Sequence, residues 1–163
     1  MTILRSILLL LGLWFSVSGI AAAQSADNED YPIIGMWKFN KEASMALGQT
    51  RDFRARTETY ELSQDGRITM TVSTDEAGGS SSEVTIAWNA RGGITRPDSD
   101  GRRYVEARLS PGRWLVTYLL ADGSQQVTLE KVVSMDGRTM RETWRGFSEQ
   151  GQPFEVHALF DRQ

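Results

Sequence analysis

The sequence contains no cysteine and a single histidine, His157. Without cysteine the chain has no thiol nucleophile, no disulfide bond and no thiolate metal ligand. A single histidine argues against a multi-histidine metal centre, and it leaves a Ser-His-Asp triad with one candidate base. We therefore expect no metal ion and no cofactor, and a fold whose stability comes from a hydrophobic core and a well-formed sheet.

An excess of basic residues is also missing. The 163 residues include 18 Lys and Arg against 21 Asp and Glu, for a formal net charge of −3, whereas nucleic-acid-binding domains are basic. We therefore expect no nucleic-acid partner. Hydrophobic residues make up 40% of the chain and charged residues 24%, which is typical of a globular protein. At this length we expect one folded domain and a monomer.

The chain begins with a candidate signal peptide. Arg5 is its only charged residue, an apolar stretch runs from Ile7 to Val17, and three alanines end at Ala23, as in secretory signal peptides. A membrane anchor is the alternative, because the apolar run could almost span a bilayer, but the alanines and the polar residues after them favour cleavage. We expect residues 1–23 to be the signal peptide, 24–32 a flexible acidic leader and 33–163 the folded domain.

The predicted location follows from this segment. Cleavage after Ala23 would release the protein to the periplasm or the medium. No cysteine is present for acylation, so we expect no stable membrane anchor after cleavage.

Turn signals divide the rest of the chain at regular intervals. Asp-Gly pairs such as Asp65-Gly66 and Asp136-Gly137 favour the tight turns of hairpins, because glycine reaches positive φ freely. Between the turns, runs rich in Thr, Val, Ile, Tyr and Trp alternate in polarity, as strands do. Nine strands are predicted, at residues 33–40, 53–62, 67–75, 82–90, 102–109, 113–121, 125–134, 138–147 and 153–162. A further strand at 94–97 is weakened by Pro97.

Short loops between the strands allow only antiparallel neighbours. One helix is predicted at residues 41–47, where Asn40 can cap the start and Gly48 can end it. The sequence therefore predicts an all-β fold, an antiparallel up-and-down β-barrel of about 8–10 strands with one short helix after the first strand. Closure into a barrel protects the strand edges; a two-sheet sandwich is the alternative.

The start of the predicted domain carries a recognisable motif, Gly35-Met36-Trp37-Lys38-Phe39, followed by a helical segment and by Thr57-Glu58-Thr59-Tyr60-Glu61. In these motifs, and in a last strand that ends Leu159-Phe160-Asp161-Arg162, the chain resembles the calycins, the lipocalins and fatty-acid-binding proteins. It is also similar to a group of exported bacterial lipocalin-like proteins of no established function, which share the G-x-W-x-x-N start, the T-x-T-Y-E strand and a D-G-x-T turn like that at 136–139.

The resemblance implies a closed barrel with an internal cavity for apolar small molecules. It also implies that Trp37 plugs the narrow end of the barrel beneath an arginine of the last strand, for which Arg162 is the match and Arg145 the alternative. Fatty-acid-binding proteins hold the ligand carboxylate with an Arg-x-Tyr pair in that strand, but the matching residues here are Ala158 and Phe160. Neither binds an anion, which argues against fatty-acid carriage by that mechanism.

Aromatic side chains in the predicted strands supply the candidate pocket. If they fill the interior, the barrel has a solid core; if they line it, the protein binds a flat or apolar molecule. The candidate pocket residues are Trp37, Phe39, Tyr60, Trp88, Tyr118, Trp144, Phe154, Ala158 and Phe160. The leading hypothesis is an exported, non-catalytic protein that binds an apolar or amphipathic small molecule.

A polar face of the second predicted strand has two interpretations. Arg54 and Arg56 share this face with Glu58 and Tyr60. The simpler interpretation places the face on the barrel exterior, and the alternative makes it a pocket wall that can hold an anion.

The alternative functions are an enzyme on the same scaffold and a ligand-free domain that binds another protein through the barrel rim. An isomerase or hydrolase would use Glu130, Glu142 or His157, although cross-strand ion pairs with Arg141 or Lys131 explain the glutamates more simply. His157 is expected to face solvent. Ionisable residues that converge inside the barrel with shifted pKa values would favour the enzyme.

The signal peptide gives a direct prediction. N-terminal sequencing of the protein recovered from outside the cytoplasm should begin at Gln24, because the small residues before it form the cleavage pattern. Exported protein that still begins at Met1 would contradict this.

Overall fold

The computed structural model describes residues 30–94, 103–119, 125–148 and 150–163. The predicted signal peptide, most of the acidic leader and residues 95–97 of the possible tenth strand lie outside these ranges. No helix among the described residues is long and apolar enough to cross a membrane.

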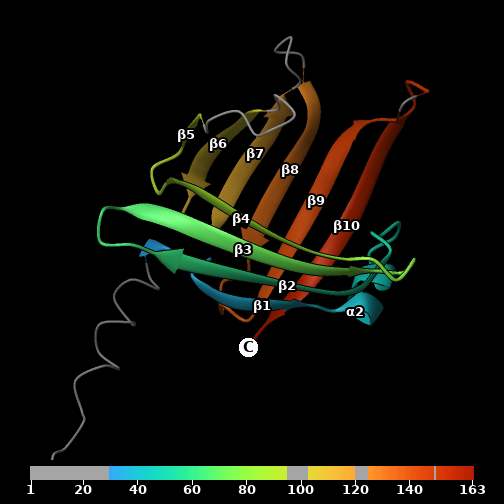
Figure 1. The fold of residues 1–163 in the computed structure, drawn as a ribbon, viewed down its shortest axis with the longest axis horizontal. Helices are drawn as coiled ribbons and strands as arrows, with labels where there is room; N and C mark the ends of the chain where they lie inside the picture. The colour runs from blue at the N-terminus through green and yellow to red at the C-terminus, as the bar shows by residue number, and fades with distance from the viewer. Residues whose placement is uncertain (1–29, 95–102, 120–124, 149) are drawn as a thin grey trace, which may run out of the picture.

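The described chain consists of ten antiparallel strands and one short helix, which confirms the predicted all-β fold (Figure 1). In chain order the elements are β1 (Gly35–Phe39), α2 (Lys41–Ala46), β2 (Phe53–Leu62), β3 (Arg67–Glu76), β4 (Ser81–Asn89), β5 (Gly93–Ile94), β6 (Arg103–Ser110), β7 (Arg113–Leu119), β8 (Gln125–Val133), β9 (Thr139–Phe147) and β10 (Pro153–Arg162).

The sheet closes into a nearly complete barrel, in which the first strand of the chain pairs with the last. The strand order is β4-β3-β2-β1-β10-β9-β8-β7-β6-β5, and β1 meets β10 with Trp37 opposite Arg162 and Phe39 opposite Phe160. In Figure 1 strands β2 to β4 run across the direction of β6 to β10, so the sheet folds back over itself. Among the described residues, β4 and β5 form no hydrogen-bonded ladder, which leaves a seam between them.

Two of the predicted Asp-Gly turns have the same local structure. In the segment 63–67, the Asp65 carboxylate accepts hydrogen bonds from the Ser63 hydroxyl and the Arg67 amide, and Gly66 has a φ of 77°. The segment 134–138 repeats this arrangement, with Gly137 at a φ of 68°. The serine and aspartate thus fix the turn, and glycine supplies the backbone conformation that other residues rarely adopt.

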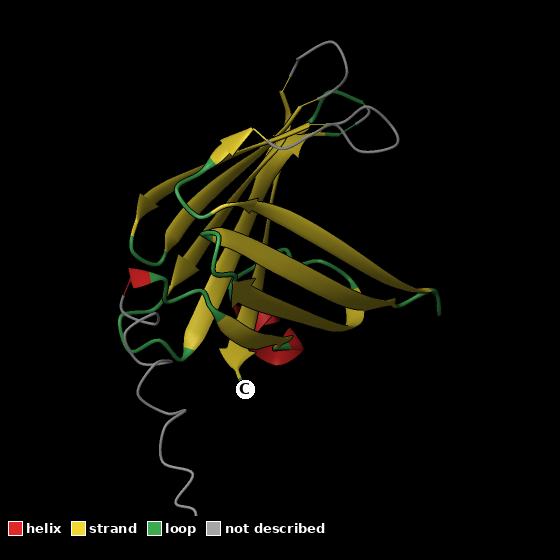
Figure 2. Cartoon of the chain, turned by 60° about the vertical axis from the view of Figure 1, so that its left-hand side comes forward, coloured by secondary structure: helices red, strands yellow, loops and turns green. Residues whose placement is uncertain are grey.

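The predicted helix forms and packs beside the end of β10 (Figure 2). The Asn40 side chain accepts a hydrogen bond of 2.9 Å from the Ala43 amide, the N-cap interaction expected from the sequence. The buried hydroxyl of Ser44 accepts a hydrogen bond of 2.7 Å from the Leu159 amide, which fixes the helix to the barrel.

Trp37 and Arg162 close one end of the barrel as the calycin resemblance implies. The fully buried Trp37 ring donates its N–H to the Ile33 carbonyl at 2.7 Å, and the Arg162 guanidinium lies 4.2 Å from the ring centroid. A Cβ on Gly35 would lie 2.7 Å from this guanidinium, which explains the glycine of the G-x-W motif. Arg145 instead pairs with Glu155 on the outer face, so Arg162 is the stacked arginine.

The barrel interior next to this end is filled. Phe39 packs edge-to-face against Phe53 and Phe160, with ring centroids 5.5 and 5.8 Å apart. Ala158 and Phe160 are fully buried in this cluster, so the apolar side of β10 faces inward, as the alternation of the sequence predicts.

Candidate ligand-binding site

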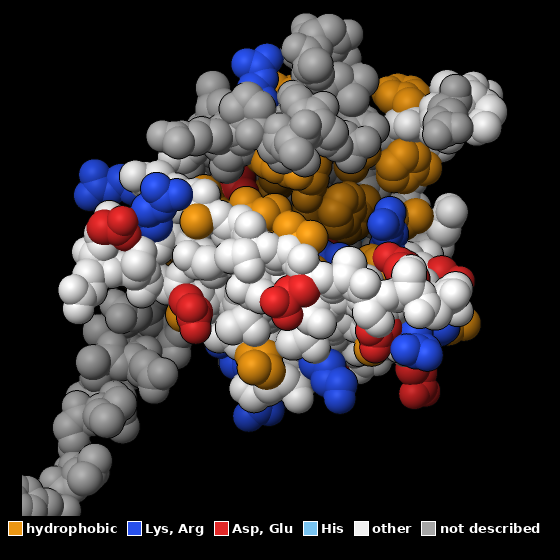
Figure 3. Space-filling model, viewed as in Figure 1, with side chains coloured by type: hydrophobic (Ala, Val, Ile, Leu, Met, Phe, Trp, Pro, Cys, Tyr) orange, Lys and Arg blue, Asp and Glu red, His pale blue; other side chains and the backbone are white. Residues whose placement is uncertain are grey.

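A cavity lies in the other half of the barrel, against strands β3, β4, β6, β7 and β8. The space between the lining atoms is about 370 Å³ and includes open solvent. The volume open to the centre of a water molecule is about 20 Å³, or room for roughly one molecule. Figure 3 shows hydrophobic side chains gathered in a hollow between β4 and the strands behind it. The lining residues are Ile33, Met70, Ile86, Trp88, Tyr104, Glu106, Trp114, Val116, Tyr118, Leu129 and Lys131.

The predicted pocket residues divide between this cavity and the filled core. Trp88 and Tyr118 line the cavity. Trp144 stacks on Tyr118 with the ring centroids 5.6 Å apart, but it does not line the cavity. The remaining candidates lie off the cavity lining: Trp37, Phe39, Tyr60, Ala158 and Phe160 are buried, and Phe154 is half-buried.

Three side chains that line the cavity each carry a buried polar atom with no hydrogen-bond partner among the described residues. These atoms are Nε1 of Trp88, Nε1 of Trp114 and Oε2 of Glu106, and all three side chains are buried. The two indole rings lie edge-to-face at 6.4 Å. A buried polar group without a partner costs about 1–3 kcal/mol, so unpaired groups that surround one cavity indicate a place where a polar atom of another molecule binds.

Burial favours the protonated, uncharged form of the Glu106 carboxyl. Burial raises its pKa from 4.5 to about 8, and the nearby Lys131 ammonium only partly opposes this shift. A protonated carboxyl both donates and accepts hydrogen bonds, so the cavity wall offers neutral hydrogen-bonding groups.

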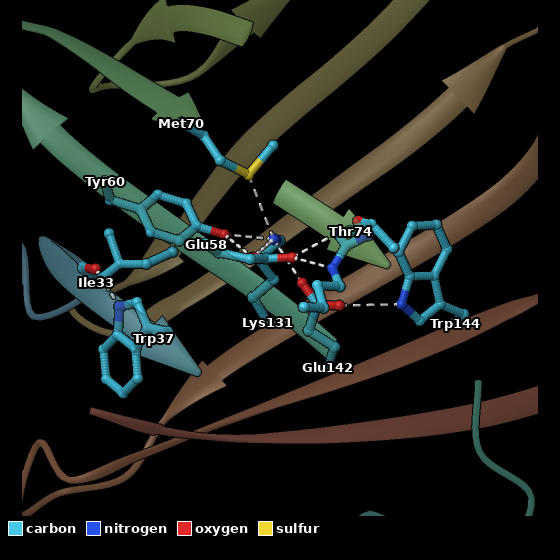
Figure 4. A network of polar contacts seen from close by, with 10 residues as sticks. Ile33, Trp37, Glu58, Tyr60, Met70, Thr74, Lys131, Glu142 and Trp144 are labelled. Carbon is cyan, nitrogen blue, oxygen red and sulfur yellow. Dashed lines mark hydrogen bonds and ion pairs between the residues drawn. The ribbon is translucent and has the colours of Figure 1, made fainter. Parts of the chain in front are cut away.

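A buried network of charges crosses the barrel beside the cavity (Figure 4). The Lys131 ammonium on β8 lies 2.8 Å from Glu58 Oε2 on β2 and 2.5 Å from Glu142 Oε1 on β9. The Tyr60 hydroxyl donates to Glu58 at 2.5 Å, and the Arg56 guanidinium donates to the other Glu58 oxygen at 2.8 Å. We call Arg56, Glu58, Lys131 and Glu142 the ion quartet; it combines two cations with two carboxyl groups.

The members of the ion quartet differ in how firmly they hold a charge. Burial favours a protonated Glu58, but Lys131 and Arg56 outweigh it and lower the pKa of this carboxyl to about 2. Burial raises the pKa of Glu142, and the neighbouring Glu58 charge adds to that shift. The pKa of Lys131 is raised by its two carboxylates although burial opposes this. Glu58 and Lys131 therefore form the fixed ion pair of the network.

The structure corrects two interpretations of polar residues. The exterior placement of the second-strand face is wrong for Arg56, Glu58 and Tyr60, which point inward. A register shift between Phe53 and Ala55 separates Arg54 from them, and Arg54 is exposed beside Asp75.

Glu130 and Glu142 cannot act as a carboxylate pair. Lys131 lies opposite Glu142 in the ladder, so Glu130, one residue earlier, faces outward, where it pairs with Arg113 and Arg145. The predicted Lys131–Glu142 pair is confirmed, but inside the barrel. His157 lies on the outer side of β10, 3.3 Å from Glu155, away from the cavity.

Glu106 is a site residue that the sequence interpretation did not select; Trp114 belongs to the aromatic residues of the predicted strands but not to the candidate pocket residues. In the strand around Glu106, the residues Val105, Ala107 and Leu109 form the apparent apolar face, but Tyr104 and Glu106 point inward. The sequence signal for this inward face was the spacing Tyr104-x-Glu106, which places an aromatic residue and a glutamate on the same side of the strand. Among the described residues, no group of Asp, Glu or His is arranged to hold a metal ion.

Comparison with solved structures agrees with the antiparallel barrel fold. A single-site mutant of the fluorescent protein UnaG matches with a TM-score of 0.55 at 11% sequence identity, over 81% of this chain and 96% of that one. Wild-type UnaG matches with a TM-score of 0.52 at 13% identity, over 80% and 96%. The likeness confirms the fold implied by the resemblance. No family model and no curated protein matches the sequence.

The raised pKa of Glu106 predicts how stability depends on pH. Between pH 4.5 and about 8 the unfolded glutamate has lost its proton while the folded one keeps it. The unfolded chain then binds fewer protons, so the free energy of unfolding falls as pH rises, by up to about 1.4 kcal/mol per unit for this group. Glu106→Gln should remove that fall, and urea denaturation between about pH 6 and pH 8 measures it.

Glu130→Gln is the matched control. The pKa of Glu130 is lowered by its two arginines although burial opposes this, so it stays ionised in both states over the same range and its removal should leave the pH slope unchanged. Equal slopes for the wild type and Glu106→Gln would show that Glu106 is ionised in the folded protein.

Proposed function

We propose that this chain is an exported, monomeric and non-catalytic binding protein that holds a small, largely apolar molecule inside its barrel. The observation that carries the proposal is the cavity lined by aromatic and aliphatic side chains, in which Trp88, Trp114 and Glu106 present unpaired buried polar atoms. Apolar walls with a few convergent polar groups are typical of small-molecule sites.

Entry of a ligand requires the cavity walls to separate, since the cavity admits roughly one water molecule. The seam between β4 and β5 offers a place for this, because no ladder joins the two strands among the described residues. The cavity wall contains residues from both sides of the seam, Ile86 and Trp88 on β4 and Tyr104 and Glu106 on β6. Widening the seam therefore enlarges the cavity without breaking strand pairs.

Binding is favoured over catalysis by the state of the interior charges. Ionisable groups with shifted pKa values do converge inside the barrel, which is one condition for an enzyme. Proton transfer, however, needs a base free to accept a proton. Glu58 is bound by Lys131, Arg56 and Tyr60, and Glu142 is paired with Lys131. The Glu106 carboxyl keeps its proton and is suited only to a general-acid role, with no free base beside it among the described residues that line the cavity.

Export is supported by the signal-peptide pattern of residues 1–23. The protein-interaction alternative would leave the cavity without a role, and the unpaired groups in its wall would then only destabilise the fold.

Native mass spectrometry of the protein purified from the cells that make it tests the proposal. The wild type should retain a small molecule as an added mass. Val116→Phe should remove that mass, because Val116 lines the cavity and a ring at this position fills it.

Thr117→Phe adds the same ring one residue further along β7, on the outer face, and should keep the retained mass. Wild-type protein without any added mass would overturn the proposal. Equal retention of the added mass by Val116→Phe and Thr117→Phe would also overturn it.

A further inference from the structure

We infer that the cavity selects an uncharged, flat molecule with a carbonyl or similar hydrogen-bond acceptor, held by the indole N–H groups of Trp88 and Trp114 and by the Glu106 carboxyl. The inference rests on the proposed function and narrows it to a ligand class. It starts from three buried atoms on one cavity that lack partners among the described residues.

The unpaired groups call for an acceptor. Each indole N–H is a donor only, and a protonated carboxyl adds a third donor. A carbonyl oxygen can accept from two donors at once, and the ligand thereby removes the cost of the unpaired groups.

The ion quartet excludes an anionic ligand. Its two cations, Arg56 and Lys131, are already bound by Glu58 and Glu142 at 2.5–2.8 Å. A ligand carboxylate in the cavity would find no free cation among the described residues, and burial of an unpaired charge is strongly unfavourable.

A cationic ligand is disfavoured by the same wall. The carboxylate nearest the cavity-lining Lys131 is already bound by this ammonium, so it offers no free negative charge to a cation. The Glu106 carboxyl keeps its proton at neutral pH and supplies no counter-charge.

The aromatic side chains of the wall suit a flat ring system once the walls separate. Trp88 and Trp114 lie edge-to-face at 6.4 Å, and Tyr104 and Tyr118 do so at 4.8 Å. Aliphatic side chains complete the wall between these pairs. Rings pack against rings in such a cavity with an extra gain over their burial.

Four naphthalenes of nearly the same size test the inference by calorimetric titration of the mature protein near neutral pH. They are 2-acetylnaphthalene with a neutral acceptor, 2-ethylnaphthalene with no polar group, 2-naphthoate with a negative charge and 2-naphthylmethylammonium with a positive charge. The ketone should bind about ten-fold more tightly than the hydrocarbon, and both ions more weakly than the hydrocarbon.

Variants locate the acceptor site. Trp88→Phe, Trp114→Phe and Glu106→Leu should each lower the ratio of ketone to hydrocarbon affinity by about five-fold. Glu106→Gln keeps a neutral donor and should retain the ratio, as should Glu130→Gln on the outer face. The ratio of ketone to hydrocarbon affinity corrects for any change in cavity size, because both ligands have nearly the same size. If a variant fails to fold, the affinities of the four ligands for the wild type still test the inference.

The outcomes separate this inference from the function on which it rests. Equal affinity for ketone and hydrocarbon would overturn the inference and leave a purely apolar pocket. Tightest binding of the naphthoate or of the ammonium would overturn it in favour of a charged ligand. Failure of all four to bind would count against the small-molecule function itself.

Discussion

The fixed ion pair between Lys131 and Glu58 is the interaction on which the interior of this barrel depends. It joins β8 to β2, which are not neighbours in the sheet, and Glu142 and Arg56 complete it within 2.8 Å. Loss of one partner from a buried pair costs about 3–5 kcal/mol, because the other charge remains without compensation. The network therefore holds opposite walls at a fixed distance, with a filled core on one side and the cavity on the other.

The balance of these charges also sets the character of the cavity. Because each cation of the ion quartet is bound by a carboxylate, the groups left over are neutral: two indole N–H groups and a protonated carboxyl. A fatty-acid-binding protein keeps a free arginine for its ligand, and Ala158 and Phe160 stand here at the matching positions. The missing clamp and the balanced quartet point to the same class of ligand.

Much of the fold was predictable from the sequence, and little of the site was. The period-2 alternation and the Asp-Gly turns act locally, so the strands and the helix capped by Asn40 follow from short segments. The Trp37–Arg162 closure joins distant segments and was expected only from the calycin resemblance. The alternation of polarity did not predict that Lys131 and Glu106 point inward, because apolar residues also occupy the outer faces of β6 and β8. Lys131 lies inside because partners from distant strands meet it, and that depends on the closed barrel. Glu106 lies inside with an oxygen unpaired among the described residues, which the alternation of polarity does not predict.

The most direct measurement is an NMR spectrum of the tryptophan indole N–H groups while 2-acetylnaphthalene is added. The signals of Trp88 and Trp114 should shift, since these N–H groups are unpaired and belong to side chains that line the cavity. Those of Trp37 and Trp144 should stay in place, because they already donate to Ile33 and Glu142. Shifts confined to Trp37 and Trp144, or an unchanged spectrum, would contradict a binding site between Trp88, Trp114 and Glu106.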